Sequence, residues 1–308
     1  MGSEAQGRPG VLLVGAAILD VMVLSARMDF SVRDSAPSED IHISYGGDAL
    51  NEAAVLAHLG KKVYLNTILG KDREGDMIEA HCQERGIELT GSCRREGLQT
   101  GINVVLVGEE GERHFLTNTN GSLRKLTLAD VVETFPPDVG ILSFASIFVF
   151  PDMGDPQMAC VFRRAKEQGL LVCADMTKRK RGERIQDIRQ SLAYVDYLLP
   201  NEEEAYLVTG ADCPEEAARL LQEAGASHVV VKCGKKGCYV LDKGEGFYVP
   251  PASPVEAVDT TGAGDSFAGG FLYGLSEGWP IHRCAEFANA CGAKAVTCVG
   301  AATWCDYD

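Results

Sequence analysis

Residues 258–271 read VDTTGAGDSFAGGF, and the rest of the fold can be assembled around this stretch. Its polar start leads into Gly262-Ala263-Gly264, after which apolar residues recur at helical spacing, so a helix is predicted to begin at the glycines. Unpaired N–H groups at a helix start attract anions, and glycine lets a phosphate approach closely. Asp265 falls in the first turn, where a carboxylate could deprotonate a hydroxyl that attacks phosphorus. By itself the motif also fits an ordinary helix start with glycines for tight packing.

The composition is that of a globular α/β protein. The chain has 308 residues, 45% of them hydrophobic, enough for one large domain or two small ones. Its 29 Lys and Arg against 44 Asp and Glu give a net charge of −15, which argues against a nucleic-acid or acidic-membrane partner. No apolar run approaches the roughly 20 residues that span a bilayer, and the polar start MGSEAQGRPG does not resemble a signal peptide. We therefore expect a cytoplasmic protein.

The 11 cysteines include no CxxC pair. Four of them, at positions 284, 291, 298 and 305, are seven residues apart. Seven residues of helix rise about 10.5 Å, which is too far for neighbouring ligands of one metal ion. We interpret the cysteines as small buried thiols in a reducing compartment.

Short apolar runs alternate with helical patterns along most of the chain. Strands are predicted at residues 11–14, 63–69, 139–145, 170–174, 197–199 and 229–232, with a hairpin at 238–241 and 246–249. Helices are predicted at residues 50–59, 76–85, 155–168, 185–193, 202–209, 214–224, 264–277 and 281–299. This alternation predicts an α/β fold with a doubly wound, mostly parallel sheet. Further strands within about 22–44 and 99–117 are expected to cap a single domain that spans residues 1–308.

The turn after the first predicted strand argues against two common nucleotide-binding classes. Gly15 is the only glycine there, whereas a dinucleotide-binding fold needs GxGxxG at this point. The chain also has no GxxxxGK[ST] sequence, which removes the P-loop class. A dehydrogenase is therefore a distant alternative.

Polar residues follow several predicted strands. Asp20, Asn201 and Gly234 each come after a strand, and Asp265 opens a helix. Ligands of open α/β sheets bind at the carboxyl ends of the strands. We therefore expect these residues to meet in one cleft.

Two motifs have both a structural and a functional interpretation. Asn201 and Glu204 could form a capping box, or Asn201 could bind a phosphate and Glu204 a hydrated Mg²⁺. Gly46 and Gly47 could be a bare turn before a helix, or a surface against which a polyol lies while Asn51 bonds a hydroxyl.

Five motifs occur together in a fixed order: GGDALNEAAVLAHLG (46–60), GKDREGD (70–76), NEEE (201–204), KCGKKG (232–237) and DTTGAGDSF (259–267). Together they resemble the ribokinase-like, or PfkB, family of carbohydrate kinases. The resemblance spans nearly the whole chain, and the last motif is the most specific.

The resemblance implies a three-layer α/β/α domain with a small β-sheet lid, and transfer of the ATP γ-phosphate to a hydroxyl of a small sugar. Asp265 matches the family's catalytic base, and Gly262, Ala263 and Gly264 match its anion hole. The sugar-binding positions match Asp20, Gly46, Gly47 and Asn51. The ATP-binding positions match Asn201, Lys232, Gly234, Gly237 and Asn289.

The resemblance also implies metal sites and a mode of assembly. Glu204 matches a position that binds Mg²⁺ through water. Many members of the family need K⁺, and the equivalent positions are Asp259, Thr261, Ala295, Cys298 and Gly300. Homodimers that form through the lid are common in the family.

Departures from the ribokinase pattern leave the substrate open. Asp48 stands where ribokinases usually carry Lys, and Ile18 stands where they carry Asn, so ribose itself is doubtful. Asp48 could bind an extra hydroxyl or an amine, or cap the helix. The basic cluster at 178–184 could be a solvated loop or could steer anions towards the phosphates.

Two alternatives to a sugar kinase stay open. A nucleoside kinase of the same family would stack a base on aromatic rings, for which Phe144, Phe148 and Phe150 are the sequence candidates. A non-catalytic sugar-binding regulator on the same fold is the other, although the intact GAGD motif argues against it.

Overall fold

The computed structural model describes residues 10–25, 37–91, 93–108, 113–252 and 255–306. Its centre is a nine-stranded sheet in the order β15-β14-β13-β12-β11-β10-β1-β4-β6. The strands are β1 (Gly10–Val14), β4 (Val63–Asn66), β6 (Ile87–Leu89), β10 (Val139–Ile147), β11 (Leu171–Met176), β12 (Tyr197–Leu198), β13 (His228–Lys232), β14 (Cys238–Asp242) and β15 (Glu245–Val249). The sheet is parallel from β6 to β13, and only the β13–β14 and β14–β15 pairs are antiparallel. The predicted doubly wound sheet is therefore confirmed.

Helices cover both faces of this sheet. They are α1 (Asp48–His58), α2 (Arg73–Glu84), α3 (Asp155–Glu167), α4 (Arg189–Leu192), α5 (Glu202–Thr209), α6 (Pro214–Glu223), α7 (Ala263–Ser276) and α8 (Ile281–Ala295). Alternate residues of β1 divide between two cores: Val11 and Leu13 pack with α1, while Leu12 and Val14 pack with α3. A strand that is buried on both faces belongs to the middle layer of a three-layer domain.

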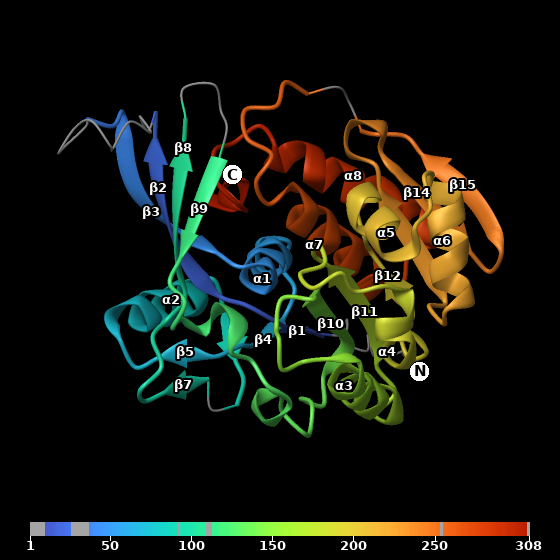
Figure 1. Ribbon diagram of the computed structural model, residues 1–308, viewed down its shortest axis with the longest axis horizontal. Helices are drawn as coiled ribbons and strands as arrows, with labels where there is room; N and C mark the ends of the chain where they lie inside the picture. Colours follow the sequence, from blue (N-terminus) through green and yellow to red (C-terminus); the bar gives the residue numbers. More distant parts are fainter. Residues whose placement is uncertain (1–9, 26–36, 92, 109–112, 253–254, 307–308) are drawn as a thin grey trace, which may run out of the picture.

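A second sheet forms the predicted lid. It has the order β3-β2-β8-β9 and consists of β2 (Ile18–Leu24), β3 (Asp40–Gly46), β8 (Ile102–Val107) and β9 (Arg113–Thr117). Figure 1 shows it projecting from the domain, with α1 between it and α7. The chain between β2 and β3 and the turn between β8 and β9 lie largely outside the described residues.

The register of the lid strands separates a polar from an apolar face. Neighbouring residues across strands point to the same face. Asp20 pairs with Ser44 and with Asn103, and Asn103 pairs with Thr117. The opposite face carries the apolar set Val21, Val23, Ile41, Ile43, Val104, Leu106 and Leu116.

Several element boundaries differ from the sequence-based prediction. The predicted strand 63–69 ends at Asn66, and Leu69–Gly70 forms the separate β5, which pairs with β7 (Arg94–Arg95). The predicted helix 185–193 is a 3₁₀ turn, Ile185–Ile188, followed by the four residues of α4. The predicted helix 281–299 ends at Ala295, because the chain then turns to pack residues 296–300 beside the start of α7.

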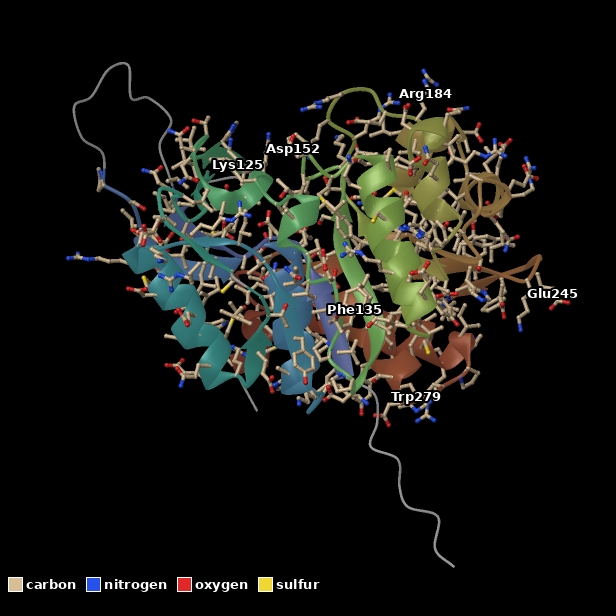
Figure 2. The ribbon with its side chains drawn as sticks, turned by 90° about the horizontal axis from the view of Figure 1, so that it is seen from below. Lys125, Phe135, Asp152, Arg184, Glu245 and Trp279 are labelled. Atoms are coloured by element: carbon tan, nitrogen blue, oxygen red, sulfur yellow. The ribbon has the colours of Figure 1, made fainter. Side chains whose placement is uncertain are left out.

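The cysteines are free thiols, as predicted, and most of them are buried. None of the described helices is long and apolar enough to cross a membrane. Phe135, labelled in Figure 2, belongs to the same buried cluster as the apolar residues of α3 and is only 4% exposed.

Candidate active site

The GAGD motif begins α7 as predicted. Gly262 is the N-cap residue and adopts a left-handed conformation with φ 70°. A Cβ on Gly262 would lie 2.7 Å from Ala301 Cα, so both the backbone conformation and the space require glycine. Ala263 and Gly264 open the helix, and Asp265 lies in its first turn. Ala263, Gly264 and Asp265 of this first turn line the cleft described below.

Asp265 is held by a single neutral partner. Asn51 of α1 donates from Nδ2 to Asp265 Oδ2 at 2.6 Å. Burial raises the pKa of Asp265 to about 6, and the negative charge of Asp175 adds to this rise, while the Asn51 hydrogen bond and Lys232 oppose it. The carboxylate thus belongs to a half-buried residue with a raised pKa.

Asp20 approaches from the lid. Its backbone lies in β2 beside Gly46, where a side chain would collide with the Asp20 carboxylate. Asn103 of β8 donates to Asp20 Oδ1 at 3.1 Å. Burial raises the pKa of Asp20, and the Asn103 hydrogen bond lowers it in part. Asp20 and Asp265 also repel each other, which places them in the same region.

Gly47 makes the turn from the lid into α1. Its φ is 95°, and a Cβ there would lie 2.5 Å from Ala16 O. Since α1 begins at the next residue, this turn aims the first residue of α1 into the cleft. The predicted glycine pair is therefore required by the backbone.

A cavity of about 790 Å³ opens at the carboxyl ends of the parallel strands. Its lining collects residues that are remote in sequence: Asn201, Glu204, Lys232, Gly234, Gly237, Ala263, Gly264, Asp265 and Asn289. Asp20, Gly46, Gly47 and Asn51 lie beside it rather than in its lining, at the junction with the lid. The volume lies in the range of small-molecule sites.

Asp175, which the sequence did not reveal as a site residue, anchors Lys232. Asp175 ends β11, Lys232 ends β13, and the two form a buried ion pair in the cavity lining. Burial by itself would lower the pKa of Lys232, but Asp175 and Glu204 outweigh it, so the pKa is raised and the ammonium stays charged. In the sequence, the position of Asp175 directly after the predicted strand 170–174 could have indicated this role.

Asn201 and Glu204 form the predicted capping box at the start of α5. Asn201 Oδ1 accepts from the N–H of Glu204 at 2.9 Å, and Glu204 Oε2 accepts from the N–H of Asn201 at 2.8 Å. Burial raises the pKa of Glu204 to about 7; Lys232 opposes the rise, and Asp175 adds to it. The structural interpretation is thus confirmed, and the same two side chains line the cavity.

The far end of the cavity is bounded by the antiparallel hairpin and α8. Gly234 and Gly237 both have positive φ in the turn after β13. Asn289 of α8 donates to the carbonyls of Val249 and Pro250 at 3.3 and 2.9 Å, and so fixes the end of β15 against the helix.

The residues expected around a monovalent cation lie together behind the start of α7. Asp259 Oδ1 accepts from the N–H of Thr261 at 2.7 Å, and Oδ2 accepts from the N–H of Gly300 at 2.8 Å. The hydroxyl of Thr261 is buried without a hydrogen-bond partner. The carbonyl of Ala295 accepts from the N–H of Cys298 at 3.3 Å.

Two acidic residues of α1 were not assigned a role from sequence. Asp48 lines the cavity and accepts a hydrogen bond from the Ser146 hydroxyl at the end of β10. The N-cap is Gly47 and makes no side-chain hydrogen bond, so Asp48 does not cap the helix. Glu52 is fully buried, with Ser143 Oγ donating to Oε2 at 3.0 Å, and burial raises its pKa well above the usual range.

The aromatic residues proposed from sequence do not form a stacking platform. Phe144 and Phe150 are 1% and 4% exposed and pack edge-to-face in the core, and Phe148 is half-buried against the same core. The sequence did not reveal this burial, because it does not show that Phe144 points to the α3 side of β10. Phe115 of β9, which is 59% exposed, instead lies on the lid face that carries Asp20.

The basic segment 178–184 is mostly solvated, and Figure 2 shows Arg184 at the periphery of the molecule. Lys178 forms an ion pair with Glu203. Lys180 lies nearer the cleft than the rest of the segment. Burial, and then the positive charge of Arg124, lower the pKa of Lys180, while Asp48 and Glu204 are close enough to oppose this effect.

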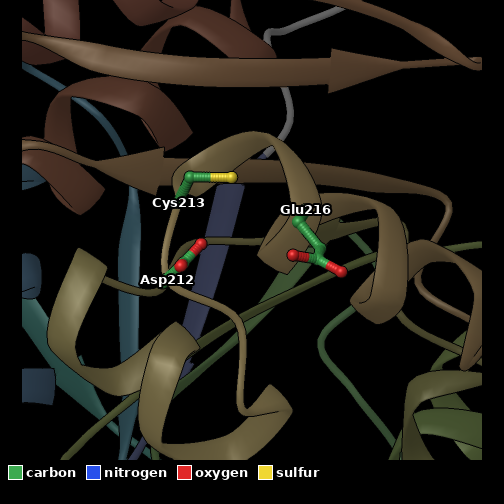
Figure 3. A group of neighbouring side chains, drawn as sticks. All are labelled: Asp212, Cys213 and Glu216. Carbon is green, nitrogen blue, oxygen red and sulfur yellow. The ribbon is translucent and has the colours of Figure 1, made fainter.

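A separate cluster lies at the start of α6. Asp212, Cys213 and Glu216 bring one ligand atom each within 4.8 Å of one another. Figure 3 shows the three side chains. Asp212 and Glu216 are exposed, and exposed acidic groups are common at a helix start, where they favour the dipole. The cluster shares no residue with the cavity lining.

Comparison with known proteins gives the family. Residues 9–306 match the model of the pfkB family of carbohydrate kinases. A cytidine kinase of Thermococcus kodakarensis is 30% identical over 244 residues, covering 78% of this chain and 83% of that protein. A ribokinase of Haemophilus influenzae is 26% identical over 275 residues, covering 87% and 86%.

Solved structures agree. Arabidopsis thaliana ribokinase, in complex with ribose and ATP, superposes with a TM-score of 0.80 at 25% identity over 96% of this chain and 95% of that one. A candidate ribokinase II of E. coli, in complex with ATP and Mg²⁺, gives 0.79 at 26% identity over 96% and 94%. The chain belongs to the pfkB family of carbohydrate kinases, and it is an ATP-dependent kinase of this class.

Proposed function

We propose that the protein transfers the γ-phosphate of ATP to a hydroxyl of a small carbohydrate, with Asp265 as the general base. The observation that supports this most directly is the position of Asp265. Its half-buried carboxylate lies in the first turn of α7, beside the GAG turn and at the junction of lid and cavity. A base and an anion hole on one helix turn suit attack of a hydroxyl on phosphorus.

The rest of the cleft provides for the phosphates. Phosphoryl transfer depends mainly on positioning and on neutralising charge. Ala263, Gly264 and Lys232 line the same cavity, and a Cβ on Gly264 would lie 3.6 Å from Lys232 Nζ, so the transferred group would lie between this turn and the ammonium. Glu204 is a buried carboxylate with a raised pKa and no cation of its own beyond the shared Lys232, and such a group fits a hydrated Mg²⁺ that would supply charge neutralisation.

The acceptor would bind between the lid and α1. Asp20 and Asn51 offer a carboxylate and an amide to its hydroxyls, and the absence of a side chain at Gly46 leaves room for the Asp20 carboxylate. Asp265 lies within hydrogen-bond distance of Asn51, so a hydroxyl bound by Asn51 also reaches the base. Closure of the lid would exclude water and limit ATP hydrolysis.

Replacement of Asp265 tests this proposal. We expect Asp265→Asn to lower kcat by about 10²–10⁴ with little change in KM, because a general base acts mainly in the transition state. The assay measures ADP release with a panel of sugars, ATP and Mg²⁺, and thermal unfolding checks that the variant folds. Full activity in Asp265→Asn would refute the assigned role. A panel without any turnover, combined with sugar-induced stabilisation, would instead favour a regulator.

We also propose that K⁺ binds at the loop that Asp259 organises. The buried hydroxyl of Thr261 and the nearby carbonyls of Ala295, Cys298 and Gly300 are oxygen donors beside the start of α7. A cation there would stabilise the anion hole without touching the substrate. We expect KCl to raise activity relative to NaCl at equal ionic strength, and to raise the melting temperature of the ATP-bound protein.

A nucleoside acceptor is a second candidate because of Phe115. Its exposed ring lies two residues from Thr117 on the lid face that carries Asp20, where it could stack on a base. The T. kodakarensis relative acts on cytidine by name. If nucleosides are substrates, Phe115→Ala raises their KM more than it raises that of a free sugar; an equal effect on both would remove the stacking role.

A further inference from the structure

Three carboxylates surround the acceptor end of the cleft, and each is held by a neutral donor. Asn103 donates to Asp20 at 3.1 Å, Asn51 donates to Asp265 at 2.6 Å, and the Ser146 hydroxyl donates to Asp48. Within the described chain, none of the three has a Lys, Arg or His at ion-pairing distance. Their negative charge is therefore left for a ligand to satisfy.

The other end of the cleft carries basic as well as acidic side chains. The basic side chains among the described residues of the cavity lining are Lys232 and Lys235, and both come from the segment that leads into the hairpin. Asp175 already pairs with Lys232. The basic side chains therefore lie at the end of the cleft proposed for the nucleotide phosphates, together with Asp175 and Glu204, whereas the side chains named above at the acceptor end are carboxylates.

Asp48 is the carboxylate that the transfer step does not use. It is the first residue of α1, and Ser146 fixes its side chain in the cavity lining. A carboxylate can accept about four hydrogen bonds, so the bond from Ser146 leaves room for a ligand donor. An acceptor hydroxyl can supply that donor, whereas a carboxylate or phosphate on the acceptor cannot.

We propose that Asp48 restricts the acceptor to polyhydroxylated molecules that carry no carboxylate or phosphate, and that it accepts a hydrogen bond from a non-reacting hydroxyl. This inference rests on the proposed function and narrows it. A second negative group beside Asp48, Asp20 and Asp265 meets like charges in a partly desolvated cleft, where repulsion is strong. A hydroxyl of the substrate instead meets carboxylates that can accept its hydrogen bond.

The like charges of the cleft also act on Asp48 itself. Burial raises the pKa of Asp48 well above its usual range, and Asp265 and Asp175 raise it further, while Lys232 opposes them. An anionic acceptor would add to the repulsion that already disfavours these carboxylates.

Lys180 is the competing determinant. It lies near Asp48 and Glu204 at the rim of the cleft, so a charged acceptor could pair with it. Its ammonium is also close enough to Arg124 for mutual repulsion. Separate variants of Asp48 and Lys180 therefore distinguish a site that rejects anions from one that recruits them.

The experiment compares matched acceptors: ribose with ribose 1-phosphate, and fructose with 5-dehydro-2-deoxygluconate. We measure kcat/KM for wild type, Asp48→Asn, Lys180→Gln and the surface control Glu167→Gln, whose residue pairs with Arg163 on α3. Thermal unfolding with and without ATP verifies folding and nucleotide binding in each variant.

We expect wild type to prefer the neutral member of a pair by about 100-fold or more, and Asp48→Asn to lower kcat/KM for that member by about tenfold while the preference shrinks. Glu167→Gln should match wild type. Preference of the wild type for a charged member overturns the inference, as does a preference that Lys180→Gln alters and Asp48→Asn does not. If ATP stabilises the protein but no acceptor is phosphorylated, the proposed function itself fails, and the inference with it.

Discussion

Asp265 shows how the surroundings of one carboxylate set its chemistry. Burial raises its pKa to about 6, and the Asn51 amide restrains that rise. A base with this pKa is largely ionised at neutral pH yet still basic enough to take a proton in the transition state. The same carboxylate in water would be a weaker base.

This environment predicts the pH dependence of the reaction. The ionised form of Asp265 is the active one, so kcat/KM for the acceptor should fall with about unit slope below pH 6 and level off above it. Asn51→Ala removes the hydrogen bond that lowers the pKa and should move the limb to higher pH. Steady-state assays at saturating MgATP over pH 5–9 would measure the shift.

Asn289→Ala is the control for that measurement. Asn289 bonds the carbonyls of Val249 and Pro250 and does not contact Asp265, so its loss should raise the KM for ATP and leave the acid limb in place. A limb that moves equally in both variants would show that the titrating group is not Asp265.

At the scale of elements, both ends of α1 depend on glycine, but for different reasons. Gly47 precedes the helix with φ 95°, and a Cβ would lie 2.5 Å from Ala16 O. Gly60 follows it with φ 78°, and a Cβ there would meet nothing within 4 Å. A side chain at position 47 would therefore be strained and would also collide with Ala16, whereas a side chain at position 60 would only be strained.

The two ends therefore form a matched pair of substitutions. Gly60→Ala should reduce the free energy of unfolding by about 1 kcal/mol, the cost of a left-handed alanine. Gly47→Ala should cost about 1–3 kcal/mol more, because the turn must also shift away from Ala16, and it should weaken acceptor binding. Urea unfolding and acceptor KM are the measurements. Equal stability losses would contradict the close packing of this turn.

At the scale of the whole molecule, the lid has an apolar face directed away from Asp20. Ile41, Ile43 and Leu116 on this face are 62%, 54% and 61% exposed. A contiguous apolar surface of this kind is typical of a protein interface. We propose that a second copy of the chain covers it.

Assembly can be tested directly. We expect the wild type to sediment as a dimer and Ile43→Glu to sediment as a monomer, because a buried unpaired carboxylate opposes association. Leu171 is the first residue of β11, outside the lid, and is 37% exposed. Leu171→Glu should therefore leave the dimer intact. A wild type that remains monomeric at tens of micromolar contradicts the proposal. We expect the monomeric variant to lose activity if closure of the lid depends on the partner.

The sequence by itself determined the order of the elements, the GAG turn and the capping box, because these follow from local preferences: helical spacing, glycine at special backbone conformations, and side chains that bond the nearest N–H groups. Motif spacing likewise indicated the family and nine of the residues that line the cavity. Boundaries that depend on distant packing, such as the early end of α8, could not be predicted.

Only the tertiary structure decided what each polar group faces. It paired Asp175 with Lys232, turned Phe144 and Phe150 into the core, and directed Asp48 into the cleft rather than onto the helix end. These outcomes depend on contacts between residues about 57 to 98 positions apart in sequence, as for Asp175 with Lys232 and Asp48 with Ser146. Charge, burial and hydrogen bonding act through space, so the electrostatics of the cleft exist only once the chain has folded.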